Sequence, residues 1–201
     1  MRAHGTEDRL VETRRQQIDD VASALFRERG YAATSVREIA RAVDLQGASL
    51  YAHVASKEAL LWSIVERVAE QFRASAEAAE ATSGSAADRL AAFIHGHVGV
   101  VTVERAHAAV FLQDWRFLEP EHRAAVAERR EAYEATLRAI LRDGAEDGSL
   151  RPMSEQHAAI AGRAVLAALN GIPAWFRPDG PATPETIATA ELAIFMEGLR
   201  P

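Results

Sequence analysis

The sequence contains no cysteine, and its 201 residues include no apolar run long enough to suggest a membrane span, which takes roughly 18 residues. Without cysteine there is no disulfide, no thiolate metal site and no cysteine nucleophile, so nothing requires an oxidising compartment. The first thirty residues are charged throughout and lack the apolar core of a signal peptide. We therefore expect a soluble cytoplasmic protein that does not act at a membrane.

Basic residues are not in excess either. The 23 lysines and arginines are outnumbered by 29 aspartates and glutamates, which gives a net charge of −6. This balance argues against a protein that binds nucleic acid over its whole surface. The charge is unevenly divided, because residues 1–58 hold 9 basic and 9 acidic side chains whereas residues 59–201 hold 14 and 20. The N-terminal part is therefore neutral, and the acidic surplus lies in the remainder.

Proline is absent before Pro120, and alanine occupies 42 positions, so the chain is rich in helix formers and poor in helix breakers. Apolar residues recur with the helical period, and no segment alternates as a half-buried strand does. The sequence therefore predicts an all-α protein of about nine helices, with a loop at Gly144–Pro152. The predicted helical segments are Ile18–Gly30, Ser35–Val43, Gln46–His53, Ser56–Ala81, Leu90–Val101, Ala106–Arg116, Pro120–Asp143, Ser154–Trp175 and Pro184–Leu199.

Two of these segments are very short and are joined by the tight turn Val43-Asp44-Leu45. The first begins with Ser35, and Glu38 follows three residues later, which is the spacing of a capping box. One longer helix precedes the pair. This order is typical of a helix-turn-helix module, whose second short helix reads DNA.

The amino-acid sequence of this region is distinctive. Its segments are LFRERGY at Leu25–Tyr31, TSVREIA at Thr34–Ala40, GASLY at Gly47–Tyr51 and SKEAL at Ser56–Leu60. These segments closely resemble the TetR family of bacterial one-component repressors. The resemblance implies a helix-turn-helix domain at residues 1–58 and a larger helical domain for ligand binding and dimerisation at residues 59–201. It further implies a ligand-responsive repressor that binds a palindromic operator in double-stranded DNA as a homodimer and is released by a small-molecule effector.

Ten residues of the module are candidates for DNA contact. Gly47, Ala48 and Ser49 keep the recognition helix narrow enough for a major groove about 12 Å wide, although small residues also serve close helix packing. Gln46 can pair with adenine or simply be solvated, and the family resemblance implies phosphate contacts for Tyr51 and Lys57. Gln46 and Val54 depart from the family pattern and leave the operator sequence open. The full set is Thr34, Ser35, Arg37, Gln46, Gly47, Ala48, Ser49, Tyr51, His53 and Lys57.

The alternative to a regulator is a helical enzyme, because Glu104-x-x-His107 and Glu119-x-x-His122 have the spacing used by di-iron bundles. A helix between the two pairs would hold them on the order of 20 Å apart at about 1.5 Å per residue, too far to share a cluster. No Gly-rich phosphate loop accompanies them. We therefore predict a regulator that is not an enzyme and has neither metal nor cofactor, and we keep a di-iron-like oxidoreductase as the alternative.

The last two helices, about residues 154–176 and 184–199, are the expected dimer interface. The apolar face of the final helix is wider than one neighbour would cover, which favours a subunit interface over a purely internal helix. The family resemblance places the interface in the same two helices.

The ligand of the larger domain is suggested by two segments. Phe111–Leu118 mixes large apolar groups with a few polar ones, as a pocket wall does, although core packing would explain it equally well. Asn170–Pro181 loosely resembles TetR regulators of lipid, sterol and acyl-CoA catabolism, which implies an acyl-CoA or a similar amphipathic metabolite, with flavonoids, drugs and antibiotics as competitors. Arginines 116, 123, 129 and 130 are available for its phosphates. The candidate ligand residues are His97, Phe111, Gln113, Asp114, Trp115, Arg116, Tyr133 and Trp175.

Overall fold

A computed structural model describes the backbone of residues 4–199 and the side chains of residues 14–46 and 49–199. Every regular element in that range is helical, which confirms the predicted fold class. The elements are α1 (His4–Arg29), α2 (Val36–Ala42), α3 (Gly47–Leu50), α4 (Lys57–Glu80), α5 (Ala86–Val103), α6 (Arg105–Gln113), the 3₁₀ turn η1 (Trp115–Phe117), α7 (Pro120–Asp147), α8 (Glu155–Trp175) and α9 (Pro184–Leu199).

Local sequence signals set most of the helix ends. Ser35 and Glu38 form the predicted capping box at α2, with the Ser35 backbone N–H donating to the glutamate over 2.8 Å. The Ser56 hydroxyl accepts from the Ala59 N–H at the start of α4. Gly30 ends α1 with a φ of +85°, in the left-handed region that favours glycine. Caps at these positions stabilise helices that would be marginal alone.

The prediction of a loop from Gly144 is wrong. α7 continues through Gly144 to Asp147 and ends at Gly148, whose φ is +76°. Gly144 lies so close to Leu150 that a Cβ atom there would stand 2.5 Å from a methyl carbon of the leucine. The glycine therefore serves close packing inside the helix, and the next glycine supplies the stop.

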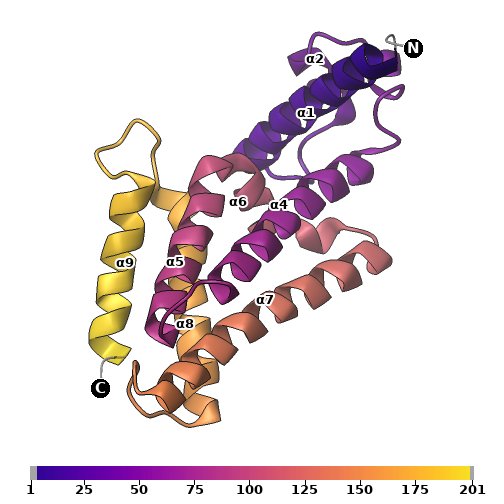
Figure 1. The fold of residues 1–201 in the computed structure, drawn as a ribbon. Coiled ribbons are helices and arrows are strands. Elements are labelled where there is room, and N and C mark those ends of the chain that lie inside the picture. The colour runs from indigo at the N-terminus through magenta and orange to yellow at the C-terminus, as the bar shows by residue number, and fades with distance from the viewer. Residues whose placement is uncertain (1–3, 200–201) are drawn as a thin grey trace.

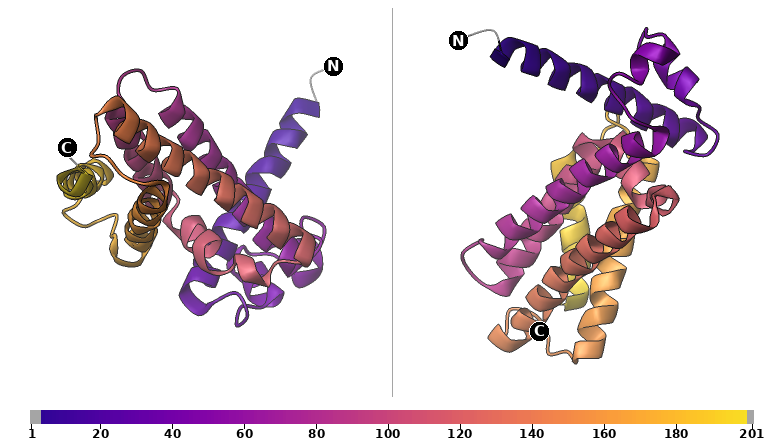
Figure 2. Two further views of the ribbon diagram at one scale, coloured as in Figure 1. Left: turned by 90° about the horizontal axis from the view of Figure 1, so that it is seen from below. Right: turned by 90° about the vertical axis from the view of Figure 1, so that its right-hand side faces the viewer.

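The helices form a bundle with a small module at one end (Figure 1). α1 lies across that end and packs against α2, α4 and α6. The long helix α4 runs from the module into the bundle, where it packs on α5, α6 and α7. α9 packs against α5 at the edge of the bundle, as the additional views in Figure 2 also show.

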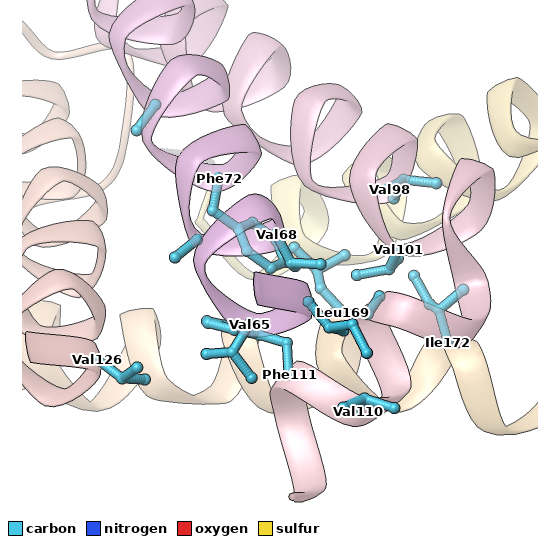
Figure 3. Close-up of a cluster of buried hydrophobic side chains, with 14 of the residues drawn as sticks. Val65, Val68, Phe72, Val98, Val101, Val110, Phe111, Val126, Leu169 and Ile172 are labelled. Carbon is cyan, nitrogen blue, oxygen red and sulfur yellow. The ribbon is translucent and has the colours of Figure 1, made fainter. Parts of the chain in front are cut away.

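A continuous hydrophobic core joins the two parts. In the bundle it is made by inward-facing side chains of α4 to α9, part of which Figure 3 shows around Val68, Val101 and Leu169. In the module it contains Phe26, Ile39 and Leu50, each no more than 1% exposed. Because α4 contributes to both groups, the module is packed onto the bundle rather than tethered to it.

The sequence predicts no segment long and apolar enough to span a membrane, and α8 differs from that expectation. Among the described residues, α8 alone is long and apolar enough to cross a membrane by length and composition. Only 33% of its most apolar stretch is buried in the single chain. Much of the apolar surface of α8 therefore lies outside the core of one chain.

Candidate DNA-binding surface and ligand cavity

The helix-turn-helix module is held together by arginines of α1. Arg14 donates to the Val43 carbonyl in the turn over 2.8 Å, and Arg15 donates to the His53 carbonyl after α3 over 3.1 Å. Asp44, in the turn, has a φ of +54°, which a short polar side chain tolerates better than most residues do. These contacts fix the orientation of α3 relative to α1.

The predicted DNA-contact residues divide into two groups. Arg37, Gln46, Ser49 and Tyr51 are exposed, and Tyr51 is 56% exposed despite its large ring. Gln46 is the N-cap residue of α3, yet its side chain makes no capping hydrogen bond. These four side chains are therefore available on the outer side of the module.

The other predicted residues have partners inside the protein or are less exposed. Thr34 is buried, and its hydroxyl donates to the Gly30 carbonyl over 2.9 Å. Ser35 is the N-cap of α2, and His53 is half-buried. The backbone of Gly47 and Ala48 forms the start of α3, while the Ala48 side chain lies outside the described residues.

Lys57, the only lysine, also has internal partners. Its ammonium donates to the carbonyls of Tyr31 and Thr34 over 2.9 and 3.0 Å, and lies 4.2 Å from the centre of the Tyr31 ring. The lysine thus ties the first turn of α4 to the loop before α2. Its predicted phosphate contact stays a prediction.

An ionic cluster connects the module to the bundle. Arg67 of α4 pairs with Glu104 at the junction of α5 and α6, and His107 of α6 lies 3.3 Å from Asp20 of α1. Burial lowers the pKa of His107, and the Glu104 carboxylate opposes that shift. These contacts explain Glu104 and His107 as structural residues at the place where α1, α4 and α6 meet.

The second Glu-x-x-His pair lies elsewhere. The His122 Nδ1 lies 2.8 Å from a carboxylate oxygen of Glu58 in α4, which accepts the hydrogen bond, and the His122 ring stacks on Trp62 with ring centres 4.0 Å apart. The Glu119 backbone N–H donates to the same Glu58 carboxylate. Across the described part of the chain, no group of three or more histidines and carboxylates could hold a metal ion. The arrangement does not support the di-iron alternative.

A cavity of about 470 Å³ lies among α4, α5, α6, α7 and α8. Its apolar lining includes Phe72, Phe111 and Leu166. The polar lining includes His97, Tyr133 and Asn170 on one part of the wall, and several arginines and glutamates of α4 and α7 on another. This combination of size and lining is that of a small-molecule site.

Burial keeps the His97 and Tyr133 side chains of this wall uncharged. His97 is 1% exposed, and burial lowers its pKa to about 3, an effect that the nearby Asn170 amide partly opposes. Burial raises the pKa of Tyr133 above its usual range. The His97 Nδ1 and the Tyr133 hydroxyl are 3.1 Å apart and share one hydrogen bond. Both side chains are therefore neutral hydrogen-bonding groups at physiological pH.

Arg130 supplies positive charge to the same cavity. Its guanidinium carbon lies 5.4 Å from the centre of the Phe111 ring and 5.6 Å from that of Trp115. Burial, with Arg116 nearby, lowers its pKa, so a bound anion would be favoured electrostatically. Arg129 also lines the cavity, but it pairs with Glu66 at 3.5 Å.

The structure brings four of the eight predicted ligand residues to the cavity: His97, Phe111, Trp115 and Tyr133. Gln113, Asp114, Arg116 and Trp175 do not line it. Sequence reasoning did not single out Phe72 or Asn170, which do. Asn170 could have been noticed as the one polar side chain in the apolar stretch 164–173.

An aromatic contact joins the cavity wall to the module. Trp115 begins η1 and lines the cavity, while Phe117 ends η1 and stacks on Tyr31 with ring centres 5.3 Å apart. The Lys57 ammonium also lies over the Tyr31 ring. A three-residue turn therefore separates the cavity from the loop that begins the helix-turn-helix motif.

Comparison with known proteins agrees with both parts of the molecule. Residues 18–64 match the family described as bacterial regulatory proteins, tetR family. Residues 83–199 match the family described as tetracyclin repressor-like, C-terminal domain. The second match alone covers more than half of the chain.

Relatives that align over most of both chains are also transcriptional regulators. The HTH-type transcriptional repressor KstR2 of Rhodococcus jostii is 27% identical over 92% of this chain and 91% of its own. The TetR regulator PfmR of Thermus thermophilus is 37% identical over 92% of this chain and 99% of its own, with a TM-score of 0.82. AibR, solved with isovaleryl coenzyme A and operator DNA, is 27% identical over 91% and 98% of the chains, with a TM-score of 0.79. The chain thus belongs to the TetR family of bacterial regulatory proteins and is a ligand-responsive, DNA-binding transcriptional regulator.

Proposed function

We propose that this protein is a homodimeric cytoplasmic repressor, without catalytic activity, that leaves its operator when an acyl-CoA thioester or a similar lipid-like metabolite binds. The observation that carries the effector class is the cavity, where an apolar wall for an acyl group lies beside the guanidinium of Arg130. A thioester with an anionic head fits both features. The complex of the relative AibR with isovaleryl coenzyme A supports the same class.

Residues 1–58 form the DNA-binding part of this proposal, and residues 59–201 bind the ligand and the second subunit. Arg37, Gln46, Ser49 and Tyr51 are exposed and carry the contacts that the module offers to bases and phosphates. In a two-fold dimer the recognition helices would enter successive major grooves about 34 to 36 Å apart on a palindromic operator. Two-fold avidity offsets the lack of a basic surplus in the module.

The dimer interface in this proposal is formed by α8 and α9. Ile160 and Trp175 of α8 and Ile194 of α9 are more than half exposed in the single chain. Large exposed apolar side chains on the two C-terminal helices favour a self-complementary interface between copies. The low burial of the apolar stretch of α8, 33% in the single chain, is explained in the same way.

In this proposal, the conformational effect of ligand binding is transmitted to the module through η1. A ligand that moves Trp115 in the cavity wall would move Phe117, two residues on, and with it the Tyr31 ring that Phe117 stacks on. Tyr31 and Lys57 together hold the loop before α2. The ligand thereby favours a module geometry with the wrong spacing for the operator, by its differential affinity for the two states.

Two measurements test the proposal. An operator is first selected from genomic fragments with the purified protein, and its release is then followed by fluorescence anisotropy as acyl-CoA thioesters of increasing chain length are added. Release by at least one thioester, at concentrations where free coenzyme A has no effect, is the expected result. Failure of every thioester to change operator affinity would exclude this effector class.

The coupling route is tested by Phe117→Ala, with Val103→Ala as the matched control because Val103, at the end of α5, is 79% exposed and does not line the cavity. Phe117→Ala should bind the thioester within about threefold of the wild type yet require a markedly higher concentration for operator release. Equal release by both variants and the wild type would show that the signal takes another path.

A further inference from the structure

Polar side chains from four different helices meet on the buried side of the cavity. His97 of α5, Tyr133 of α7 and Asn170 of α8 line the cavity together, and Ser75 of α4 lies beside Tyr133. The apolar rings of Phe72 and Phe111 are next to them in the wall. The Ser75 hydroxyl donates to the Phe72 carbonyl over 2.9 Å and is a neighbour of the Tyr133 hydroxyl. A hydrocarbon ligand alone would require none of these groups.

One hydrogen-bonding atom of His97 has no partner among the described residues. Its Nδ1 is bonded to the Tyr133 hydroxyl, whereas its Nε2, on the other side of the ring, is buried without a hydrogen-bond partner among the described residues. The Asn170 amide is close to the ring but does not complete a hydrogen bond to Nε2. Buried polar atoms of native proteins usually have a partner, so an orphan beside a cavity points to a ligand.

The chemistry of the group defines what it can bind. A neutral histidine, a tyrosine hydroxyl and an asparagine amide each offer a donor and an acceptor, and none carries charge. They suit a carbonyl or hydroxyl oxygen and do not suit a carboxylate or phosphate. The charged end of a ligand belongs instead with Arg130, on the part of the wall near Trp115.

We propose that His97, Tyr133 and Asn170 form a subsite for an oxygen atom carried on the hydrocarbon part of the effector. The effector is then an oxygenated acyl or alicyclic compound, such as a keto or hydroxy derivative, rather than a plain saturated chain. This inference rests on the proposed function only in taking the cavity as the effector site. Sites built around such hydrogen bonds discriminate strongly against analogues that lack the polar group.

The test uses two soluble fatty acids that differ in one oxygen, decanoate and 9-oxodecanoate, so that it does not depend on coenzyme A. Their dissociation constants are measured without DNA by isothermal titration calorimetry on the wild type, on His97→Phe and on Asn170→Leu. Leu166→Ala is the matched control, because Leu166 lines the same cavity but is apolar. Circular dichroism and thermal unfolding verify that each variant is folded.

The wild type should bind 9-oxodecanoate at least fivefold more tightly than decanoate. Asn170→Leu and His97→Phe should bring this ratio close to one, and Leu166→Ala should weaken both ligands while leaving the ratio unchanged. If His97→Phe does not fold, the ratio in Asn170→Leu decides. A ratio near one in the wild type, or binding of neither fatty acid, overturns the subsite.

The two proposals fail separately. If 9-oxodecanoate is preferred but no thioester releases the operator, the subsite stands and the acyl-CoA assignment falls. If thioesters release the operator but the keto group makes no difference, the effector class stands and the oxygen subsite is rejected.

Discussion

At the scale of single residues, the module shows that the same polar side chains can serve DNA or the fold. Tyr51 is 56% exposed, and the exposed Gln46 side chain makes no capping hydrogen bond, which favours DNA contact for both. Lys57 and Thr34 are held by backbone carbonyls in the loop before α2. Residue type alone does not separate these roles, because both use the same donors.

The internal role of Lys57 is tested by Lys57→Met, which keeps the side-chain stem but removes the ammonium. Two charged hydrogen bonds to the Tyr31 and Thr34 carbonyls are lost, so the free energy of unfolding should fall by about 1–3 kcal/mol in urea denaturation. Tyr51→Ala, at an exposed position, should change stability by no more than about 0.5 kcal/mol while weakening operator binding. Unchanged stability in Lys57→Met would mean that the ammonium is free for phosphate.

His97 makes the stability depend on pH. Its folded-state pKa is about 3, against an ordinary value of 6.5, so below pH 6.5 the unfolded chain binds a proton that the folded chain does not. Its contribution is therefore complete above pH 6.5 and is lost as pH falls toward 3, by at most about 1.4 kcal/mol per pH unit. Urea unfolding at pH 7.5, 6.5, 5.5 and 4.5 should show a steeper loss in the wild type than in His97→Gln. Parallel curves would contradict the assignment.

At the scale of elements, glycines have different structural roles in different helices. Gly30 and Gly148 end helices because their backbones adopt positive φ. Gly144, within α7, instead makes room for the fully buried Leu150. Gly99, within α5, has open space where a Cβ atom would be. The pattern of the sequence cannot distinguish these cases, since each is decided by what packs against the position.

These environments predict opposite effects of the same substitution. Gly144→Ala should lower the free energy of unfolding by about 1–3 kcal/mol, because the added carbon overlaps the Leu150 side chain. Gly99→Ala should raise it by roughly 0.5–1 kcal/mol through helix propensity alone. Thermal and urea denaturation of the two variants provide the measurement. A stabilising Gly144→Ala would show that Leu150 relaxes without cost.

At the scale of the whole molecule, apolar surface and charge are distributed by function. The acidic surplus belongs to residues 59–201, whereas the DNA-reading part is neutral. α8 and α9, which carry large exposed apolar side chains, belong to the bundle, whereas the module lies at the N-terminal end of α4 (Figure 1). A dimer through these helices would leave both modules free to face DNA.

The proposed interface is tested by Ile194→Asp, at a residue of α9 that is 65% exposed. A buried, unpaired carboxylate at the interface should shift the protein from dimer to monomer at micromolar concentration in sedimentation velocity. Val103→Asp, at a position 79% exposed at the end of α5, should leave the dimer intact. A dimer that persists in Ile194→Asp would place the interface elsewhere.

The sequence by itself determined the helical class, the helix-turn-helix module and most helix ends, because these depend on local periodicity, capping residues and glycine backbone geometry. Four of the candidate ligand residues line the cavity, and they could be chosen from the sequence because they are large or polar groups in segments predicted to be helical. Only the tertiary structure decided that Lys57 bonds to a loop 23 to 26 residues away and that His97, Tyr133 and Asn170 share one wall. These contacts depend on how helices that are distant in the chain pack together, and no local sequence pattern indicates them.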